Sequence, residues 1–320
     1  MIHKIYILVL VFFTVMYSGC SNDSSSIVWK EIESGTTKHL FSVYFLDKKT
    51  GWVSGDDGLV MTSTDSGNTW NQSEKKGNLT DTLTRVLFLT PKNGWLTTMG
   101  KIHYTSSGGT TWGLQHQIRS GSSKPPGILD LHFVSAAEGW AVGGIDEKGI
   151  STILHTHNGG SKWEKIKNPS DKHLWGVHFV DSNYGWVVGE MGEILHTKDG
   201  GKQWIRQISK VEQPLFKVHF TGKLNGYIVG TDGLILKTSD GGNSWNKISL
   251  NIKQSLRDVM FQNEQIGWVI GEEGIILHTL NGGETWNHYP SPTTKNLQDI
   301  FFFNKTGWIV GEKGTILIGQ

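Results

Sequence analysis

Residues Gly51–Trp70 read GWVSGDDGLVMTSTDSGNTW, and the chain returns to nearly this phrase about every 41 residues. The later copies begin at Gly94, Gly139, Gly185, Gly226 and Gly267, and a shortened copy begins at Gly307. A repeat of this length indicates one supersecondary unit used many times, so it has to be interpreted before any other motif.

Each unit predicts four short antiparallel strands. In the copy from Leu174 to Ile208, β-branched and aromatic runs alternate with turns rich in Gly, Asn and Asp. Such runs are typical of strands joined by hairpins, whereas no segment of residues 27–320 has the 3.6-residue period and the caps of a helix. Four strands in a unit of this length are typical of a β-propeller blade. We therefore expect an all-β chain with almost no helix.

The two ends of the chain predict how the propeller closes. The copy that begins at Gly307 stops at Gln320, before its own fourth strand. The segment 27–32, IVWKEI, resembles that missing strand, and its Trp29 lies 41 residues before Trp70, which is the ordinary period. We expect the N-terminal strand to complete the C-terminal blade, so that residues 27–320 form one closed seven-bladed ring without open edges.

Tryptophan marks two positions of the repeat. Of the 14 tryptophans, seven open fourth strands and six follow the repeat glycine, where Tyr227 stands in the remaining copy. Large aromatic side chains at fixed places can wedge neighbouring blades together. Trp175 alone lies off both positions. Its place in the repeat is shared with Phe41, Leu129 and Phe216, and we expect it to be a core side chain as well.

The first 26 residues predict export and a lipid anchor. After a short basic start, Ile5–Tyr17 is an apolar run too short to cross a bilayer, which is typical of a signal peptide. Ser18 and Gly19 precede Cys20, the only cysteine, and residues 1–19 resemble a bacterial lipoprotein signal, except that Tyr17 stands where an aliphatic residue is commoner.

That resemblance implies lipid attachment at Cys20, with residues 20–26 as a flexible tether. The alternative is a plain secretory signal with an incidental cysteine. We expect an extracytoplasmic protein anchored to a bacterial membrane, on its periplasmic side or at the cell surface. A single cysteine excludes an intrachain disulfide.

A second phrase within the repeat, Thr-Ser-x-Asp-Gly-Gly-x-x-Trp, resembles the Asp-box of bacterial neuraminidases. Its aspartate is Asp65, Asp199 or Asp240 in three copies, whereas Asn158, Asn281 and Ser107 replace it in three others. We expect the aspartate and its glycines to cap their turn by local side-chain to backbone hydrogen bonds, which is a structural role.

The longer phrase Leu-x-x-Val-x-Phe, followed by Gly-Trp-x-Val-Gly-x-x-Gly-x-Ile-Leu-x-Thr, is more specific. Together with the Asp-box it resembles the photosystem II stability and assembly factor-like propellers over residues 27–320. The resemblance implies a non-catalytic scaffold that binds subunits of a membrane complex and aids its assembly or stability, without a cofactor. Relatives also occur in non-photosynthetic bacteria, so the partner stays open. We expect the scaffold to be a monomer that binds a protein in or near the membrane.

A carbohydrate-active enzyme is the alternative. A sialidase would need three arginines around the substrate carboxylate, and only Arg85 and Arg257 of the four arginines fall on innermost strands. Other glycoside hydrolases need two carboxylates, and acids occupy equivalent first-strand positions near the axis at Asp130, Asp258 and Asp299. The plainer interpretation is that these acids accept hydrogen bonds from the backbone or from neighbouring blades.

Histidines also fall into columns of the repeat. We place His103, His155, His196 and His278 at one third-strand position, and His132, His178 and His219 at one first-strand position. Because a column distributes its members over different blades, we expect these histidines to be separated, which does not suit a compact zinc site. His155-Thr156-His157 is a weak metal pattern, and we expect no bound metal.

One face of the propeller is the expected docking surface. Fourth-to-first connections and second-to-third turns share this face, and two five-residue extensions near the third blade fall on it. They suggest partner binding, although drift in a tolerant loop is the alternative. The candidate residues are Arg119, Lys124, Pro125, Pro126, Asp146, Glu147 and Lys148, with Arg85, Asp130, Arg257, Asp258 and Asp299 near the axis. A formal net charge of +1 offers no basic stripe for nucleic acid.

Overall fold

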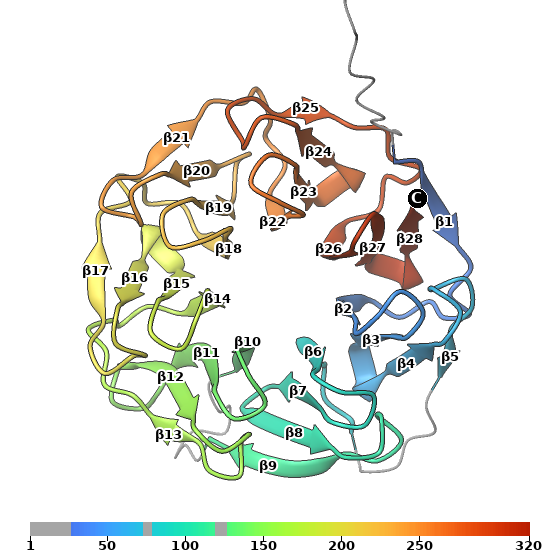
Figure 1. Ribbon diagram of the computed structural model, residues 1–320, viewed down its shortest axis with the longest axis horizontal. Helices are drawn as coiled ribbons and strands as arrows, with labels where there is room; N and C mark the ends of the chain where they lie inside the picture. The colour runs from blue at the N-terminus through green and yellow to red at the C-terminus, as the bar shows by residue number, and fades with distance from the viewer. Residues whose placement is uncertain (1–26, 73–78, 119–126) are drawn as a thin grey trace, which may run out of the picture.

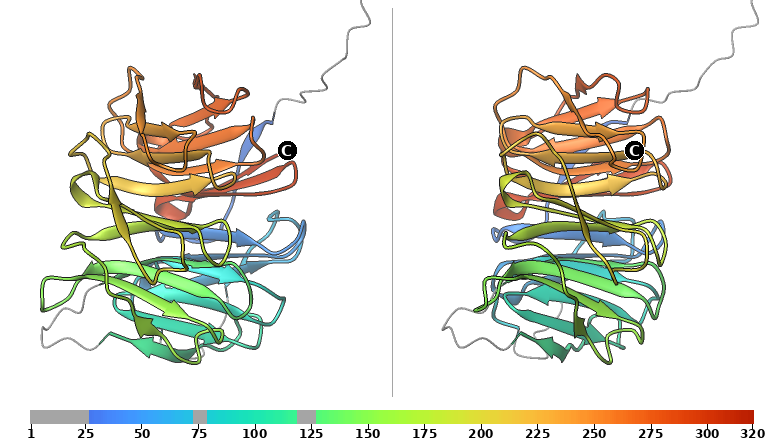
Figure 2. Two further views of the ribbon diagram at one scale, coloured as in Figure 1. Left: turned by 60° about the vertical axis from the view of Figure 1, so that its left-hand side comes forward. Right: turned by 90° about the vertical axis from the view of Figure 1, so that its left-hand side faces the viewer.

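The computed structural model describes residues 27–72, 79–118 and 127–320, which form a ring of seven four-stranded antiparallel sheets (Figure 1). The predicted all-β, seven-bladed propeller is confirmed. The side views show the blades stacked around the ring, with their connections gathered at two opposite faces (Figure 2). The predicted signal peptide, the tether with Cys20, and the loop residues Arg119, Lys124, Pro125 and Pro126 lie outside the described residues.

The blades are numbered in chain order, each from its innermost strand outward. Blade 1 contains β2 (Leu40–Phe45), β3 (Gly51–Gly55), β4 (Val60–Ser63) and β5 (Asn71–Gln72). Blade 2 contains β6 (Arg85–Phe88), β7 (Gly94–Thr98), β8 (Lys101–Thr105) and β9 (Gly113–Gln117). Blade 3 contains β10 (Ile128–Phe133), β11 (Gly139–Ile145), β12 (Ser151–Thr156) and β13 (Glu164–Lys165). Blade 4 contains β14 (Leu174–Phe179), β15 (Gly185–Gly189), β16 (Ile194–Thr197) and β17 (Ile205–Gln207). Blade 5 contains β18 (Leu215–Phe220), β19 (Gly226–Gly230), β20 (Ile235–Thr238) and β21 (Asn246–Ile248). Blade 6 contains β22 (Leu256–Phe261), β23 (Gly267–Gly271), β24 (Ile276–Thr279) and β25 (Asn287–His288). Blade 7 contains β26 (Leu297–Phe303), β27 (Thr306–Gly311), β28 (Ile316–Gly319) and β1 (Trp29–Ile32).

Helical structure in the described residues is limited to single turns of 3-10 helix, as predicted. They connect second and third strands at η1 (Asp56–Gly58), η2 (Glu190–Gly192), η3 (Glu272–Gly274) and η4 (Glu312–Gly314). Within the described ranges, no helix has the length and apolar character that crossing a membrane would require.

The seam between the two ends of the chain forms as the repeat predicts. Strand β1 pairs with β28 in antiparallel register from Trp29 opposite Gly319 to Ile32 opposite Ile316, and lies at the outer edge of blade 7 (Figure 1). The buried Trp29 ring packs edge-on against Trp268 and Phe302, with ring centroids 5.6 and 5.8 Å away. The first and last strands therefore share one sheet and one core cluster.

A phenylalanine near the end of each first strand holds neighbouring blades together. Phe179 stacks on Trp140 of the preceding blade with ring centroids 3.6 Å apart, and meets Trp204 of its own blade edge-on at 5.9 Å. The indole Nε1 of Trp140 also donates to the carbonyl oxygen of Gly200, 3.1 Å away in the Asp-box turn of blade 4. The arrangement of stacked and edge-on rings recurs around the ring, with Tyr227 replacing Trp in blade 5.

The repeat glycine before each tryptophan has a packing reason. A Cβ atom on Gly185 would lie 2.4 Å from the Phe179 ring, because that ring lies directly over the glycine of the paired strand. Any larger residue would push the phenylalanine out of its position between the two tryptophans. The Gly-Trp pair is therefore one packing unit.

The Asp-box aspartates cap their turns as expected. Oδ1 of Asp240 accepts from Thr238 Oγ1 at 2.7 Å and from the Ser244 amide at 2.9 Å, and Oδ2 accepts from Ser244 Oγ at 2.6 Å. These hydrogen bonds lower the pKa of Asp240 to about 2, and the bond from the Ser244 hydroxyl has the largest effect. Asp65 makes the same three bonds and Asp199 makes the two at Oδ1, so all three have the predicted structural role.

We predict that Trp29→Ala opens the seam at a cost of about 3–5 kcal/mol in the free energy of unfolding, because a fully packed indole leaves a cavity. Val28→Ala is the matched control: Val28 is the neighbouring residue, its side chain is 57% exposed, and a change there should cost less than about 0.5 kcal/mol. Urea unfolding followed by tryptophan fluorescence measures both. Equal losses would show that the seam contributes little.

Candidate functional site

The seven first strands enclose a pocket of about 380 Å³ at one end of the central channel. All five axial candidates from the sequence, Arg85, Asp130, Arg257, Asp258 and Asp299, line this pocket. They are joined there by Phe41, Thr84, Leu129, Trp175, Phe216, Lys217 and Gln298. These residues occupy two successive positions near the start of the first strands. Closure of the ring therefore brings together side chains that lie about one repeat apart in the sequence.

A charged network forms the floor of the pocket. Arg85 of blade 2 reaches Asp299 of blade 7 with its Nη1, at 2.7 Å, and Asp130 of blade 3 with its Nε, at 3.4 Å. Lys217 of blade 5 contacts the other oxygen of Asp130 at 3.0 Å. Ion pairs therefore cross the axis between four blades, and these buried groups neutralise one another.

The three acids also hold neighbouring blades together. Each accepts a hydrogen bond from a backbone N–H of the next blade: Asp130 from Val177 at 3.0 Å, Asp258 from Ile300 at 3.0 Å, and Asp299 from Val43 at 2.8 Å. The plainer interpretation from the sequence is confirmed, because the acids satisfy donors of neighbouring blades. They nevertheless line a pocket, so the two roles coexist.

Asp258 and Asp299 are equivalent in the repeat but differ in ionisation. Burial raises the pKa of Asp258 well above its usual value, and the nearby charge of Asp299 raises it further. For Asp299, burial acts in the same direction, but the cations Arg85 and Lys217 outweigh it and lower the pKa. The protonated form of Asp258 is therefore favoured more than in an exposed aspartate, while Asp299 is held as a carboxylate by its pairing with Arg85.

Three neighbouring blades form an aromatic and cationic rim above this floor, which we call the shelf: Trp175, Phe216 and Arg257. Trp175 stacks on Phe216 with ring centroids 4.9 Å apart, and the Arg257 guanidinium lies over the Phe216 ring at 4.6 Å. Nη2 of Arg257 also contacts Glu272 at 2.5 Å, whereas its Nε has no hydrogen-bond partner among the described residues.

The prediction that Trp175 belongs to the core is wrong, because its ring is only partly buried and lines the pocket. Its first-strand position points into the channel rather than between blades. The signal was present in the sequence: Trp175 alone of 14 tryptophans lies off the two structural positions.

The first-strand histidines are not separated as expected. Successive rings of His132, His178 and His219 lie 5.0 and 4.9 Å apart between centroids, because innermost strands converge on the channel. Burial lowers the pKa of His132 to about 4 and those of the other two well below their usual value, so all three are neutral at pH 7.

The third-strand column needs a smaller correction. His155 lies opposite Trp140, and His196 and His278 lie opposite the equivalent tryptophans, but Tyr104 takes this place in blade 2. His103 is one residue earlier, opposite Leu96. His155, His157 and Glu138 do meet in blade 3, where their ligand atoms all lie within 4.8 Å of one another.

The predicted loop residues Asp146, Glu147 and Lys148 lie in the connection from β11 to β12. This connection is at the same end of blade 3 as the pocket, since the pocket residue Asp130 faces Val142 near the end of β11. Oδ1 of Asp146 accepts from the backbone amides of Lys148 and Ile150 at 2.9 and 3.0 Å, so Asp146 stabilises its own turn.

The three-arginine arrangement of a sialidase is not assembled by the described residues. Only Arg85 and Arg257 reach the pocket. Arg206 lies on the outer strand β17 and is bound to Glu193, with Nε 2.9 Å from a carboxylate oxygen. Arg119 lies outside the described residues.

The profile of the family described as "Photosynthesis system II assembly factor YCF48" matches residues 21–113, 162–253, 206–293 and 244–320. The chain belongs to this family. A curated relative, "Photosystem II stability/assembly factor HCF136, chloroplastic" from Arabidopsis thaliana, is 41% identical over 68 residues, which are 21% of this chain. That match spans only 16% of the relative's length.

Solved structures share the fold over almost the whole chain. "YCF48 bound to D1 peptide" has a TM-score of 0.74 and 20% identity, covering 91% of this chain and 96% of that one. A GH74 xyloglucanase from Xanthomonas campestris has a TM-score of 0.70 and 11% identity, covering 90% of this chain and 53% of that one. At these identities the likeness establishes the fold alone, and the same fold carries both binding and catalysis.

The two coupled aspartates should respond differently to amide substitution. Asp299→Asn removes the charge that pairs with buried Arg85 and should cost about 3–5 kcal/mol in the free energy of unfolding. Asp258→Asn replaces a group whose neutral form is favoured by burial and by the nearby charge of Asp299. It should cost only about 1–2 kcal/mol, because the amide nitrogen cannot accept one of the two backbone bonds that Asp258 accepts.

The pH dependence separates the two variants as well. The folded protein keeps the Asp258 proton above pH 3.8, where the unfolded chain releases it, so this stabilisation is full at low pH and falls as the pH rises. Asp258→Asn should therefore flatten this decline. Chemical denaturation between pH 4 and 8 measures it, and an unchanged slope would contradict the protonated state.

Proposed function

We propose that this protein is a monomeric, non-catalytic scaffold that holds a peptide segment of a membrane or envelope protein in its axial pocket and so aids the assembly or stability of a complex. We further propose that a lipid on Cys20 anchors it on the extracytoplasmic side of a bacterial membrane. Membership of an assembly-factor family supports a binding role, and the related propeller solved with a bound D1 peptide supports a peptide as the ligand.

The observation that carries the binding proposal is the shelf beside the charged floor. Trp175 and Phe216 offer partly exposed aromatic faces, which give large contact area at little cost in conformational entropy. The Arg257 side chain is 32% exposed, and its guanidinium carries N–H donors besides the one that contacts Glu272, which can donate to a carbonyl or carboxylate oxygen of a peptide. Aromatic residues and arginine are the types that dominate binding energy at protein interfaces.

The floor is less suited to catalysis than its acids suggest. Asp299 is held by Arg85 and by the Val43 amide, and Asp258 accepts two backbone amides. Carboxylates engaged in this way are not free to flank a glycosidic bond as acid and nucleophile. The carbohydrate-active alternative therefore has weaker support, and turnover of sialosides or β-glucans by the purified protein that Asp258→Asn abolishes would favour it instead.

Site-specific photo-crosslinking in the native envelope tests the binding site. A photoreactive amino acid at Phe41, on the pocket wall, should give an adduct with a membrane or envelope protein. Trp175→Ala and Arg257→Ala should each reduce that adduct about tenfold or more, because they remove the shelf.

Ile205 provides the matched control. It is an apolar residue on the outer strand β17 with 63% of its side chain exposed, far from the axis. Ile205→Ala should leave the Phe41 adduct unchanged, and the photoreactive residue at position 205 should not give it. Adduct yields that are insensitive to the shelf would contradict binding in the pocket.

Membrane anchoring has a separate test. Cys20→Ser should move the protein from the membrane fraction to the soluble extracytoplasmic fraction and abolish incorporation of labelled fatty acid, since the cysteine is the only site for the lipid. If the wild-type protein is already soluble and unlabelled, the sequence at residues 1–19 is a plain secretory signal and the anchor proposal is wrong.

A further inference from the structure

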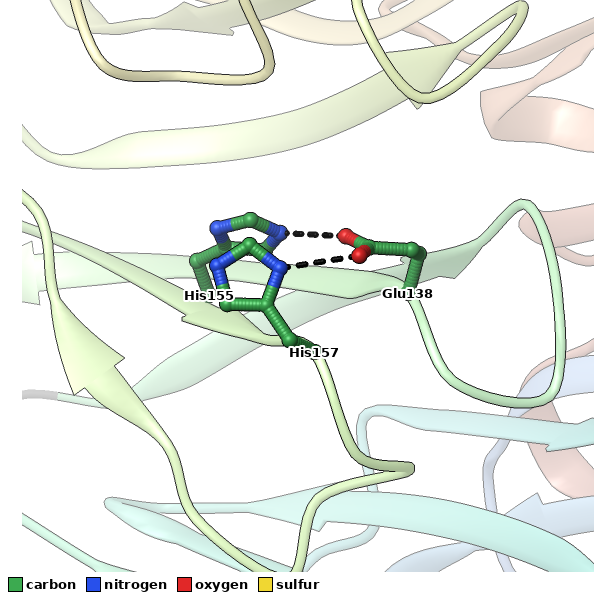
Figure 3. A group of neighbouring side chains, drawn as sticks. All are labelled: Glu138, His155 and His157. Atoms are coloured by element: carbon green, nitrogen blue, oxygen red, sulfur yellow. Dashed lines mark hydrogen bonds and ion pairs between the residues drawn. The ribbon is translucent and has the colours of Figure 1, made fainter.

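Glu138, His155 and His157 form a compact cluster in blade 3, away from the axial pocket (Figure 3). Nε2 of His155 lies 2.8 Å from one oxygen of Glu138, and Nδ1 of His157 lies 2.8 Å from the other. Figure 3 shows both imidazoles pointing the same way, toward the carboxylate. Three metal-binding side chains thus converge from strand β12, which carries His155, and from two connections of the blade, which carry Glu138 and His157.

The repeat shows that this convergence is particular to blade 3. The stacking of His155 on Trp140 recurs in blade 4, where His196 stacks on Trp186 with ring centroids also 4.6 Å apart. Nε2 of His196, however, has no hydrogen-bond partner, because Tyr184 and Lys198 stand where blade 3 has Glu138 and His157. Packing on the tryptophan therefore explains one histidine, but it does not explain the added carboxylate and second imidazole.

The chemistry of the three ligands favours a transition metal. Two imidazole nitrogens and one carboxylate suit Zn²⁺ and its neighbours, whereas Mg²⁺ and Ca²⁺ prefer oxygen ligands throughout. Bonds of about 2.0–2.1 Å in a tetrahedron place ligand atoms about 3.3 Å apart. The distances between the three ligand atoms, from 2.8 Å to within 4.8 Å, span this value, so small side-chain adjustments suffice.

We propose that Glu138, His155 and His157 bind a divalent transition-metal ion, with Zn²⁺ as the expected ion. The side chain of His155 is 7% exposed and held by its stack on Trp140, which gives the site one rigid ligand. His157 is 64% exposed, so the metal has an entry route from solvent. Three protein ligands would leave a fourth coordination position for water or for a side chain of a bound partner.

The site ties together two connections at the face opposite the pocket. Glu138 ends the hairpin between β10 and β11, and His157 begins the turn between β12 and β13. These connections lie at the far ends of the strands from Asp130 and the β11–β12 loop. A metal would therefore cross-link blade 3 at this face without occupying the proposed peptide pocket.

Zn²⁺ binding to the full chain provides the test, measured by competition with a chromophoric chelator. His157→Ala and Glu138→Gln should each weaken binding about tenfold or more, since each removes one of three ligands. His196→Gln is the matched control: it changes a histidine stacked on tryptophan in the next blade, outside the cluster, and should leave the affinity unchanged. Substituting Co²⁺ should give visible absorption bands of the intensity typical of four-coordinate sites.

Thermal unfolding distinguishes a metal site from a purely structural trio. Excess Zn²⁺ should raise the Tm of the wild type and of His196→Gln, but not that of His157→Ala. His157 is exposed, so its removal leaves the fold intact and the comparison valid. Wild-type Zn²⁺ affinity retained in both His157→Ala and Glu138→Gln, or no zinc-dependent rise in the wild-type Tm, would overturn the proposal.

Discussion

The stacking of each first-strand phenylalanine on the tryptophan of the preceding blade is the contact on which the ring depends. It sets the distance between blades, it requires glycine in the neighbouring strand, and it orients the indole that reaches the next Asp-box turn. Blade 7 shows the dependence, because no such turn follows its β28. The indole of Trp268, in blade 6, therefore donates to Gln262 instead of to a turn of blade 7. Its ring centroid lies 5.6 Å from that of Phe302 in blade 7, compared with 3.6 Å between Trp140 and Phe179.

The sequence predicts the architecture well because packing and periodicity coincide. Three features of the sequence correspond to contacts inside or between blades: the Gly-Trp pair, the fourth-strand tryptophan and the displaced strand at Trp29. These features therefore predict both the seven blades and the seam. Prediction fails where proximity comes from ring closure. The histidines at 132, 178 and 219 are far apart in sequence and belong to different blades, yet the channel brings the centroids of successive rings within 5.0 Å. Glu138 could not be assigned to its histidines without the hairpin register.

The axial pocket combines structure and recognition within the same strands. Its floor contains acids that accept backbone hydrogen bonds of the next blade. Its rim consists of side chains at the preceding position, which line the pocket and contact one another. Substitutions in the floor therefore affect folding first, whereas the rim can vary while the ring stays intact.

The seam has a consequence for biosynthesis. β1 is the first strand of the ring to be made and β28 is the last, so β1 and its Trp29 stay unpaired until β28 has been made. Until β28 is made, blade 7 cannot pair with its outer strand β1, and both strands present open sheet edges that can pair with other chains. A chain interrupted before β28 would thus be an aggregation-prone arc instead of a closed ring.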